Sequence, residues 1–547
     1  MALYLSRNFW VQPLALIPSA NTLTVIKGFF TGKLRNVNIA ISLTAALCFS
    51  YYLFLLLHNI GSIFIQWDPV MAWNNWAITW ASGHFPLQTA HYPQLLPINW
   101  SIAYVLVGKT YHLQSFAKFI MPLFPISILL ALADLAIVRR HFAYIIAIAT
   151  TAILLITTAG NFLNSGYTEI PVASMAFITI YVLLLTGCKK IQDDKATFYK
   201  LLFISSIICA GCAVTKQAGV YIAIYFALFS YLFALLNFKA TKKPTALLLS
   251  LQILLLLAIA LPWYVYVEMN AKQLGNEIPF VMSGIYKEIF GEHVLKHHIA
   301  NALIFPGLIF WFSMLAAVYF YIKEKSELVW RTIFISVVVP YTVIWMGFFY
   351  YDIRNLMLVL PLLGTVAGFG IYKACHSQKI FTFCKNQLLK TQPSYRLNLL
   401  SISIGIIIGC SIFYFTPKYL YNRQAKLQKQ VGNKEFSAAL YSLIKTQGLH
   451  GKIITSWSYL AYLPNMKKHF AMIDKNGHVI RPAFMNKKSF LKKLRKYPAQ
   501  YILYSDYSGL DGKQFKKYLE KLVTQNKATP VIIVPGFTLY KILTPLL

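Results

Sequence analysis

Four ionisable side chains stand at the ends of long apolar segments, where a side chain can reach water from the edge of a membrane. Two are carboxylates, Asp68 and Glu169, and two are cations, Lys216 and Arg354. A carboxylate at the water boundary can ionise and accept a proton, and a cation there can hold a phosphate. Together these groups suit a reaction on an anionic lipid.

Acidic residues are scarce, so each of them is a stronger candidate for a functional role. The chain has 17 Asp and Glu against 51 Lys and Arg, for a formal net charge of +34. Taken singly, each candidate also fits a polar anchor at a helix end. The acids expected on the outer face of the membrane module are Asp68, Glu169, Glu268, Glu277, Glu288, Glu292 and Asp352.

Apolar segments must position these residues. Of the 547 residues, 57% are hydrophobic and 12% are charged, and the apolar residues come in long runs, which excludes a soluble protein. The chain is therefore expected to be a polytopic α-helical membrane protein with a membrane module at residues 1–415. At about 20 residues per crossing, we expect about eleven transmembrane helices, at 38–57, 116–138, 142–160, 171–187, 198–214, 218–237, 245–267, 300–322, 331–350, 355–373 and 397–415.

Clusters of lysine and arginine predict the orientation of these helices. Cytoplasmic loops collect basic residues, and the clusters fall in alternate loops when the N-terminus is inside. This topology places the four candidates and the tail on the outer, periplasmic side of a bacterial inner membrane. We interpret 95–108 as a juxtamembrane helix, because counting it as a span would reverse every later loop.

The segment that follows Asp68 is rich in tryptophan. Trp73, Trp76 and Trp80 are spaced to share one face of a helix, with polar residues such as Asn74 turned away. The pattern predicts an amphipathic helix in the head-group layer. An aromatic belt beside a solvated carboxylate fits the same residues.

The tail, residues 416–547, differs in composition from the membrane module. Strands are expected at 452–456, 469–473, 500–504 and 531–534, with helices around 486–496 and 512–526, which predicts a small α/β domain. The tail has 23 Lys and Arg against five acids. On the outer side of a membrane such a surface favours docking to anionic lipid head groups rather than to nucleic acid; a merely solubilising surface is equally consistent.

In order along the chain, these features resemble the GT-C glycosyltransferases, in the branch of the protein O-mannosyltransferases, the lipid A aminoarabinose transferase and the rhizobial lipopolysaccharide-core transferases. The resemblance covers residues 38–415. It is carried by Asp68 after the first span, by Tyr92-Pro93-Gln94-Leu95 against a YPPL-like stretch, by Gly166 to Pro171, by Thr215-Lys216-Gln217 and by Asp352-Ile353-Arg354.

The resemblance implies transfer of a sugar from a polyprenyl-phosphate donor to a lipid, glycan or protein acceptor in the cell envelope. Asp68 would act as general base, with inversion, and Glu169 would support it or bind the acceptor. Lys216 and Arg354 would stabilise the departing phosphate. Supporting positions fall to Tyr92, Tyr167 and Asp352.

No cofactor is clearly indicated, although a divalent metal is an open alternative. Pro69 stands where the family often has a second acid, which argues against a metal held by such a pair. In the outer loop 268–299, expected to act as a lid, Glu292, His293 and His297 invite a metal interpretation. Their spacing is not HExxH, and interfacial histidines beside a carboxylate are commoner.

Three other classes of protein fit a multispan chain. A secondary transporter would place charged residues and broken helices near the bilayer midplane and would show repeats in its two halves. A polysaccharide polymerase or ligase would use a different outer loop, large and rich in arginine. A non-catalytic envelope scaffold explains everything except the gathering of acids and bases at one boundary.

Overall fold

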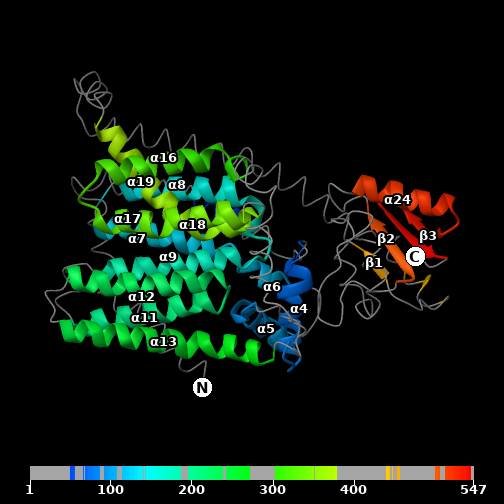
Figure 1. Ribbon diagram of the computed structural model, residues 1–547, viewed down its shortest axis with the longest axis horizontal. Helices are drawn as coiled ribbons and strands as arrows, with labels where there is room; N and C mark the ends of the chain where they lie inside the picture. Colours follow the sequence, from blue (N-terminus) through cyan, green and yellow to red (C-terminus); the bar gives the residue numbers. More distant parts are fainter. Residues whose placement is uncertain are drawn as a thin grey trace.

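A computed structural model shows a helical body and a small sheet (Figure 1). Within the helical body, the long helices run side by side, and α4 and α5 lie at one end of them. The structure describes residues 48, 50–55, 64, 66, 68–86, 92–107, 114–139, 141, 143–186, 195–237, 242–270, 302–349, 352–377, 439–440, 442–443, 446, 453–455, 499–505 and 512–543.

Helices dominate the described part of residues 1–415. In chain order they are η1 (Pro69–Trp73), α4 (Asn74–Ala81), α5 (Leu95–Val107), α6 (Gln114–Phe119), α7 (Leu123–Arg139), α8 (Ala143–Leu154), η3 (Leu155–Ala159), η4 (Gly160–Leu163), α9 (Glu169–Thr186), α11 (Lys195–Ala213), α12 (Ala218–Asn237), α13 (Lys242–Met269), α16 (Leu308–Lys323), α17 (Leu328–Ile333), η5 (Phe334–Val338), α18 (Val339–Ile344), η6 (Trp345–Phe349), η7 (Ile353–Val359) and α19 (Leu360–Ser377).

Several of these helices are long and apolar enough to cross a membrane, which confirms a polytopic helical membrane protein. Within the described ranges there are five such spans: Ala117–Arg139, Ala143–Leu163, Glu169–Thr186, Leu328–Gly347 and Ile353–Ala374. The expected spans at 198–214, 218–237, 245–267 and 300–322 also fall on helices, namely α11, α12, α13 and α16. The span expected at 38–57 is helical where it is described, and 397–415 lies outside the described residues.

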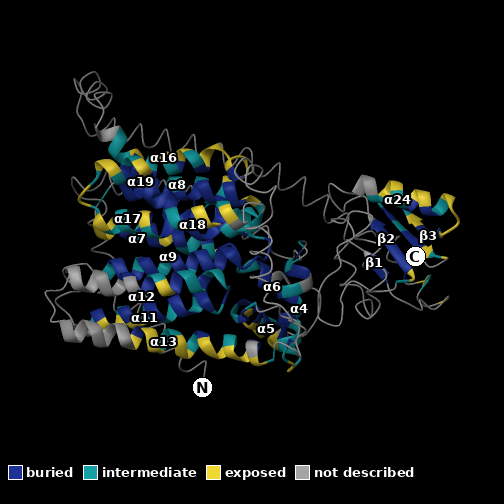
Figure 2. Cartoon of the chain, viewed as in Figure 1, coloured by how far each residue is buried: buried dark blue, intermediate teal, exposed yellow. Residues whose placement is uncertain are grey.

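Among the five spans of the described ranges, the one that contains α19 is the most buried. In the apolar stretch Ile353–Ala374, 83% of the most apolar window is buried, and Figure 2 shows α19 and α8 largely in the colour of buried residues. A Cβ at Gly368 would lie 2.5 Å from the backbone of Ala147, and one at Gly364 would lie 2.6 Å from the Cα of Thr151. Glycines four residues apart therefore let α19 and α8 approach closely, as small residues do in membrane helix pairs.

The helix α5 falls within the segment 95–108, whose juxtamembrane position stays a prediction. Its 13 residues would extend about 20 Å at 1.5 Å per residue, which is less than the hydrocarbon core of about 30 Å. Gln94 tethers its start, because its side chain accepts a hydrogen bond from Trp80 Nε1 at 3.2 Å and donates one to the Tyr92 carbonyl at 2.9 Å.

The tryptophan-rich helix exists, but it is not the interfacial helix that its pattern predicts. Trp73 and Trp76 are each only 5% exposed, and their rings pack edge to face with centroids 4.9 Å apart. Asn74, expected to face away, is buried and accepts a hydrogen bond from the hydroxyl of Tyr104. The helix is covered by the protein, so its aromatic face packs inward.

Asp134 lies inside the span Ala117–Arg139. Its position near the inner end suggests an ion pair with Arg139 or Arg140. In the structure, Asp134 Oδ2 accepts a hydrogen bond from the hydroxyl of Tyr181 at 2.8 Å, and Arg139 donates to the Leu184 carbonyl at 3.1 Å. Arg140 lies outside the described residues.

The described part of the tail is a four-stranded sheet with one long helix. Its strands are β1 (Ile453–Thr455), β2 (Tyr501–Ser505), β3 (Ala528–Val534) and β4 (Phe537–Ile542), in the order β1-β2-β4-β3, and the helix is α24 (Gly512–Thr524). β1 pairs with β2 in parallel, and the other pairs are antiparallel.

The α/β character of the tail and three of its strands agree with the sequence pattern, but β4 was not expected. Pro535 and Gly536 form the turn between β3 and β4, with Gly536 at a φ of +84°. A Pro-Gly pair after a β-rich run is a turn signal that would have revealed the hairpin. The strand expected at 469–473 and the helix expected at 486–496 lie outside the described residues.

Candidate active site

The four candidate residues lie where described helices begin or end. Asp68 directly precedes η1, and Glu169 is the first residue of α9. Lys216 lies in the short turn between α11 and α12, and Arg354 lies in the first turn of η7, which Asp352 caps. Each side chain is therefore held by a helix end, where backbone geometry is well defined.

Arg354 joins the first carboxylate to a second one. Its Nη1 donates to Asp68 Oδ2 at 2.7 Å. Its Nε donates to the two oxygens of Asp352 at 2.7 and 3.0 Å, and its Nη2 donates to Asp352 Oδ2 at 2.6 Å. The Asp352 carboxylate also accepts a hydrogen bond from the Arg354 backbone N–H at 3.1 Å. Asp352 thus holds the guanidinium through a bidentate fork.

Aromatic rings border this carboxylate–guanidinium group. The Arg354 guanidinium carbon lies 4.4 Å from the centroid of the Tyr167 ring, a cation–π contact. Tyr92 packs edge to face against Trp73, with ring centroids 4.9 Å apart. Burial raises the pKa of Tyr92, and the carboxylates of Asp68 and Glu169 raise it further. The Tyr92 phenol therefore keeps its proton and can donate a hydrogen bond.

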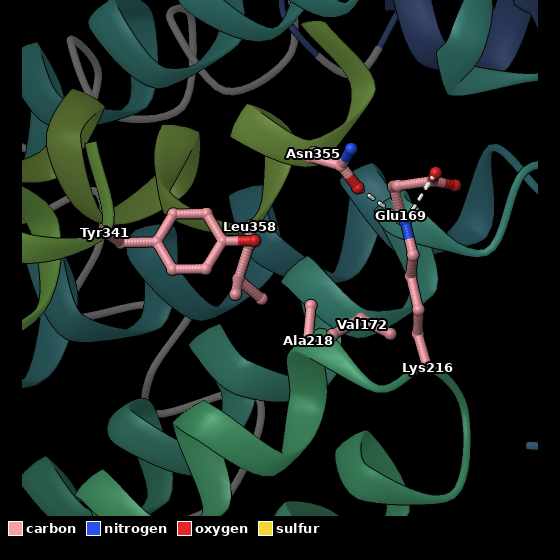
Figure 3. Close-up of a pocket in the computed structure, with 7 residues that line it drawn as sticks. All are labelled: Glu169, Val172, Lys216, Ala218, Tyr341, Asn355 and Leu358. Atoms are coloured by element: carbon pink, nitrogen blue, oxygen red, sulfur yellow. Dashed lines mark hydrogen bonds and ion pairs between the residues drawn. The ribbon is translucent and has the colours of Figure 1, made fainter. Parts of the chain in front are cut away.

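Lys216 joins the second carboxylate to an amide (Figure 3). Its Nζ donates to Glu169 Oε1 at 2.7 Å and to Asn355 Oδ1 at 2.8 Å. Glu169 and Lys216 are buried, at 6% and 9% exposed. The second oxygen of the carboxylate, Glu169 Oε2, is buried with no hydrogen-bond partner among the residues that the structure describes. Because burying an unsatisfied carboxylate oxygen is costly, this atom calls for a partner from a ligand or a water.

Arg354 and Asn355 are neighbours in the chain, so the two clusters form one site. One cluster is Asp68, Arg354 and Asp352, and the other is Glu169 with Lys216. The site therefore brings all four candidates together with Asp352. Its three carboxylates outnumber its two cations, so an incoming anion must compete with carboxylates for each positive charge.

A small cavity adjoins the buried pair. It has about 10 Å³ open to a water-sized sphere, which is room for about one water molecule. Sequence reasoning missed Asn355 and Tyr341, two polar residues at this cavity, although Asn355 directly follows Arg354 in the chain. The cavity is lined by Glu169, Val172, Lys216, Ala218, Tyr341, Asn355 and Leu358.

The metal candidates cannot be placed in this site. Glu292, His293 and His297, with most of the expected lid at 268–299, lie outside the described residues. Among the residues that are described, no group of three or more His, Cys, Asp or Glu side chains is suited to a metal ion.

Gly166 sets the approach of the Glu169 loop to Asp68. It has a φ of +91°, and a Cβ there would lie 2.4 Å from the Phe64 ring and 3.1 Å from Pro69. The Phe64 ring is fully buried and stacked on Trp100, with centroids 4.7 Å apart, so it has little freedom to move. Glycine therefore lets this loop contact the residue that follows Asp68.

Replacing Gly166 with Ala is expected to lower any activity of this site by about 10- to 100-fold, because a shift of the loop by about 1 Å would move Tyr167 and Glu169 off their partners. Gly83→Ala is the matched control, since Gly83 also has a positive φ, +75°, but nothing lies within 4 Å of its added Cβ. Activity measurements on the two variants in reconstituted membranes check this expectation. Equal losses in both would show that backbone strain alone is responsible.

The likeness to solved structures shows that the chain has the GT-C fold, the fold of a class of membrane glycosyltransferases. Two solved structures share this fold with the chain: ArnT from Cupriavidus metallidurans in the apo state and the same protein bound to undecaprenyl phosphate. Each has a TM-score of 0.50 and 13% sequence identity, over 90% of this chain and 97% of the other. No protein-family model and no curated protein sequence matches the chain.

Proposed function

We propose that the protein is a glycosyltransferase that moves a sugar from a polyprenyl-phosphate donor to a lipid, glycan or protein acceptor of the cell envelope. The observation that carries the proposal is the joined site, in which Asp68 and Glu169 each contact a cation at the ends of helices of a GT-C fold. A proton acceptor beside groups that can hold a phosphate is what this reaction needs.

Each group has a role in the proposed reaction. The acceptor oxygen bonds to the anomeric carbon while the bond from that carbon to the phosphate oxygen breaks, with inversion. Asp68 takes the proton of the acceptor hydroxyl, and the electron pair of the broken bond leaves with the polyprenyl phosphate. Arg354 and Lys216 stabilise that phosphate, and Glu169 supports Asp68 or binds the acceptor through Oε2.

An apolar pocket beside Lys216 supports a lipid-linked substrate. It has a volume of about 360 Å³ and lies between α5, α7, α9 and the end of α11. One of its residues, Thr215, directly precedes Lys216, so a chain in the pocket would place its phosphate near that cation. A structural neighbour was solved with undecaprenyl phosphate bound. The pocket is lined by Leu95, Leu96, Asn99, Ile120, Phe124, Met175 and Thr215.

The proposal includes a location and a role for the tail. The site would face the periplasm from the inner membrane, with residues 1–415 as catalytic module. Residues 416–547 would form an extracytoplasmic domain whose basic surface, including the exposed residues Lys516, Lys517 and Lys521 of α24, contacts anionic lipid head groups.

A secondary transporter is the second candidate, and the site argues against it. Transporters bind their substrates near the bilayer midplane on interrupted helices. Here the linked ionisable residues lie at helix ends, and Asp134, which lies inside a span, is satisfied by Tyr181.

Mass spectrometry of envelope lipids and glycans from cells with and without the gene would test the proposed function. We expect one species to lose the mass of a single hexose, pentose or amino sugar when the gene is deleted, which would name both donor and acceptor. Unchanged lipids and glycans, with an altered distribution of a free solute across the membrane, would instead favour the transporter.

A further inference from the structure

The guanidinium of Arg354 is already occupied by carboxylates. Asp352 holds the edge formed by Nε and Nη2, and Asp68 holds Nη1. The ring of Tyr167 covers one face. A phosphate binds arginine best through two adjacent N–H groups, and the pair that Asp352 leaves open includes Nη1. A phosphate on that pair would therefore lie directly beside the Asp68 carboxylate at Nη1, and the two negative charges would repel each other.

The two carboxylates hold Arg354 unequally. Asp352 makes three side-chain contacts with the guanidinium and a fourth with the backbone N–H, from two residues away in the same chain segment. Asp68 accepts one hydrogen bond from the guanidinium, from a different element. A competing anion therefore displaces Asp68 more easily than Asp352.

The exposed fractions of the side chains indicate that an incoming phosphate competes for Arg354 rather than for Lys216. The side chains of Arg354 and Asp68 are 21% and 27% exposed, whereas those of Lys216 and Glu169 are 11% and 6% exposed. An arriving phosphate can reach Arg354 with less desolvation.

We propose that the donor phosphate displaces Asp68 from Arg354, so that Asp68 is released from the guanidinium and acts as a base only when the donor is bound. This inference rests on the proposed function. Asp352 is a positioning residue, because it keeps the guanidinium in place while its other partner changes. Without donor, Arg354 keeps the base occupied, which protects the site from unproductive proton transfer and orders the reaction with the donor first.

Binding of undecaprenyl phosphate to the full-length protein in lipid nanodiscs tests this inference without any turnover. Removing the competing carboxylate with Asp68→Asn is expected to tighten binding by roughly 3- to 10-fold, the range that one partly exposed ion pair supplies. A variant that lost activity merely by misfolding would bind more weakly, so the direction of the change is decisive.

Two further variants serve as controls for this binding measurement. Glu324→Gln removes a carboxylate from another ion pair, which Glu324 forms with Lys373 at 2.9 Å. Lys373 lies at the far end of α19, which at 1.5 Å per residue is about 30 Å from Arg354. Glu324→Gln should leave the affinity unchanged. In an Arg354→Met background, Asp68→Asn should lose most of its gain, because no guanidinium remains to be released.

The outcomes separate the inference from the proposed function. If undecaprenyl phosphate binds the wild type but does not bind Asp68→Asn more tightly, the inference alone is overturned. The same holds if Asp68→Asn raises the affinity equally in the Arg354→Met background, since simple charge repulsion would then account for the higher affinity. If the wild type does not bind undecaprenyl phosphate at all, the proposed function fails as well.

Discussion

Replacing Asp68 with Asn is expected to reduce sugar transfer by about 100- to 10,000-fold, the usual contribution of general-base catalysis, and to leave the protein folded. The side chain keeps its size and can still accept a hydrogen bond from Arg354 Nη1, which lies 2.7 Å from Asp68 Oδ2. It loses the ability to take a proton from the acceptor hydroxyl. Transfer rates and elution profiles of the purified variant check both parts of this expectation.

Glu324→Gln is the matched control, because it too removes one carboxylate from an ion pair but lies at the other end of α19. Its transfer rate should equal that of the wild type. Near-normal turnover by the Asp68→Asn variant would remove Asp68 from the role of base and leave Glu169 as the remaining candidate.

Replacing Lys216 with Met is expected to destabilise the fold by about 3 to 5 kcal/mol, the usual cost of leaving one partner of a buried ion pair alone. Glu169 would then be buried with neither oxygen paired, since Oε2 already has no partner. Asn355 would also lose the Nζ donor at 2.8 Å. Thermal unfolding of the variant in detergent, followed by a transfer assay below its Tm, measures the two effects.

The double variant Lys216→Met with Glu169→Gln separates stability from chemistry. Neutralising the carboxylate should restore most of the lost stability, because no uncompensated charge remains buried, while transfer should stay low. Full recovery of transfer would mean that the pair has only a structural role. Failure of the double variant to regain stability would mean that Lys216 acts on the fold through Asn355 rather than through Glu169.

The transmembrane architecture could be predicted because a bilayer allows few solutions. Every backbone group in hydrocarbon must be paired within its own segment, so a long apolar run such as Glu169–Thr186 must be a helix. Packing between helices was harder to predict. The periodicity of Trp73 and Trp76 shows that they share a face, but not that protein rather than lipid covers it.

The residues of the candidate site could be identified from their positions at the ends of spans, but the contacts between them could not. Lys216 and Arg354 were expected to hold the donor phosphate, yet in the structure both contact carboxylates. Arg354 and Asp68 are 286 residues apart in the chain, and no local pattern reports a contact over that separation. Asn355 was missed for the same reason, since only the fold brings it to Lys216.

Labelling of a cysteine introduced as Asp68→Cys tests the central claim, that polyprenyl phosphate binds beside this position on the outer face of the membrane. The parent protein, in which the cysteines with described side chains, Cys48, Cys209 and Cys212, are all buried, provides the background. We expect an impermeant maleimide to label the variant from outside intact spheroplasts, and added polyprenyl phosphate to slow that labelling. Labelling from the cytoplasmic side only, or a rate that polyprenyl phosphate does not change, would contradict the account.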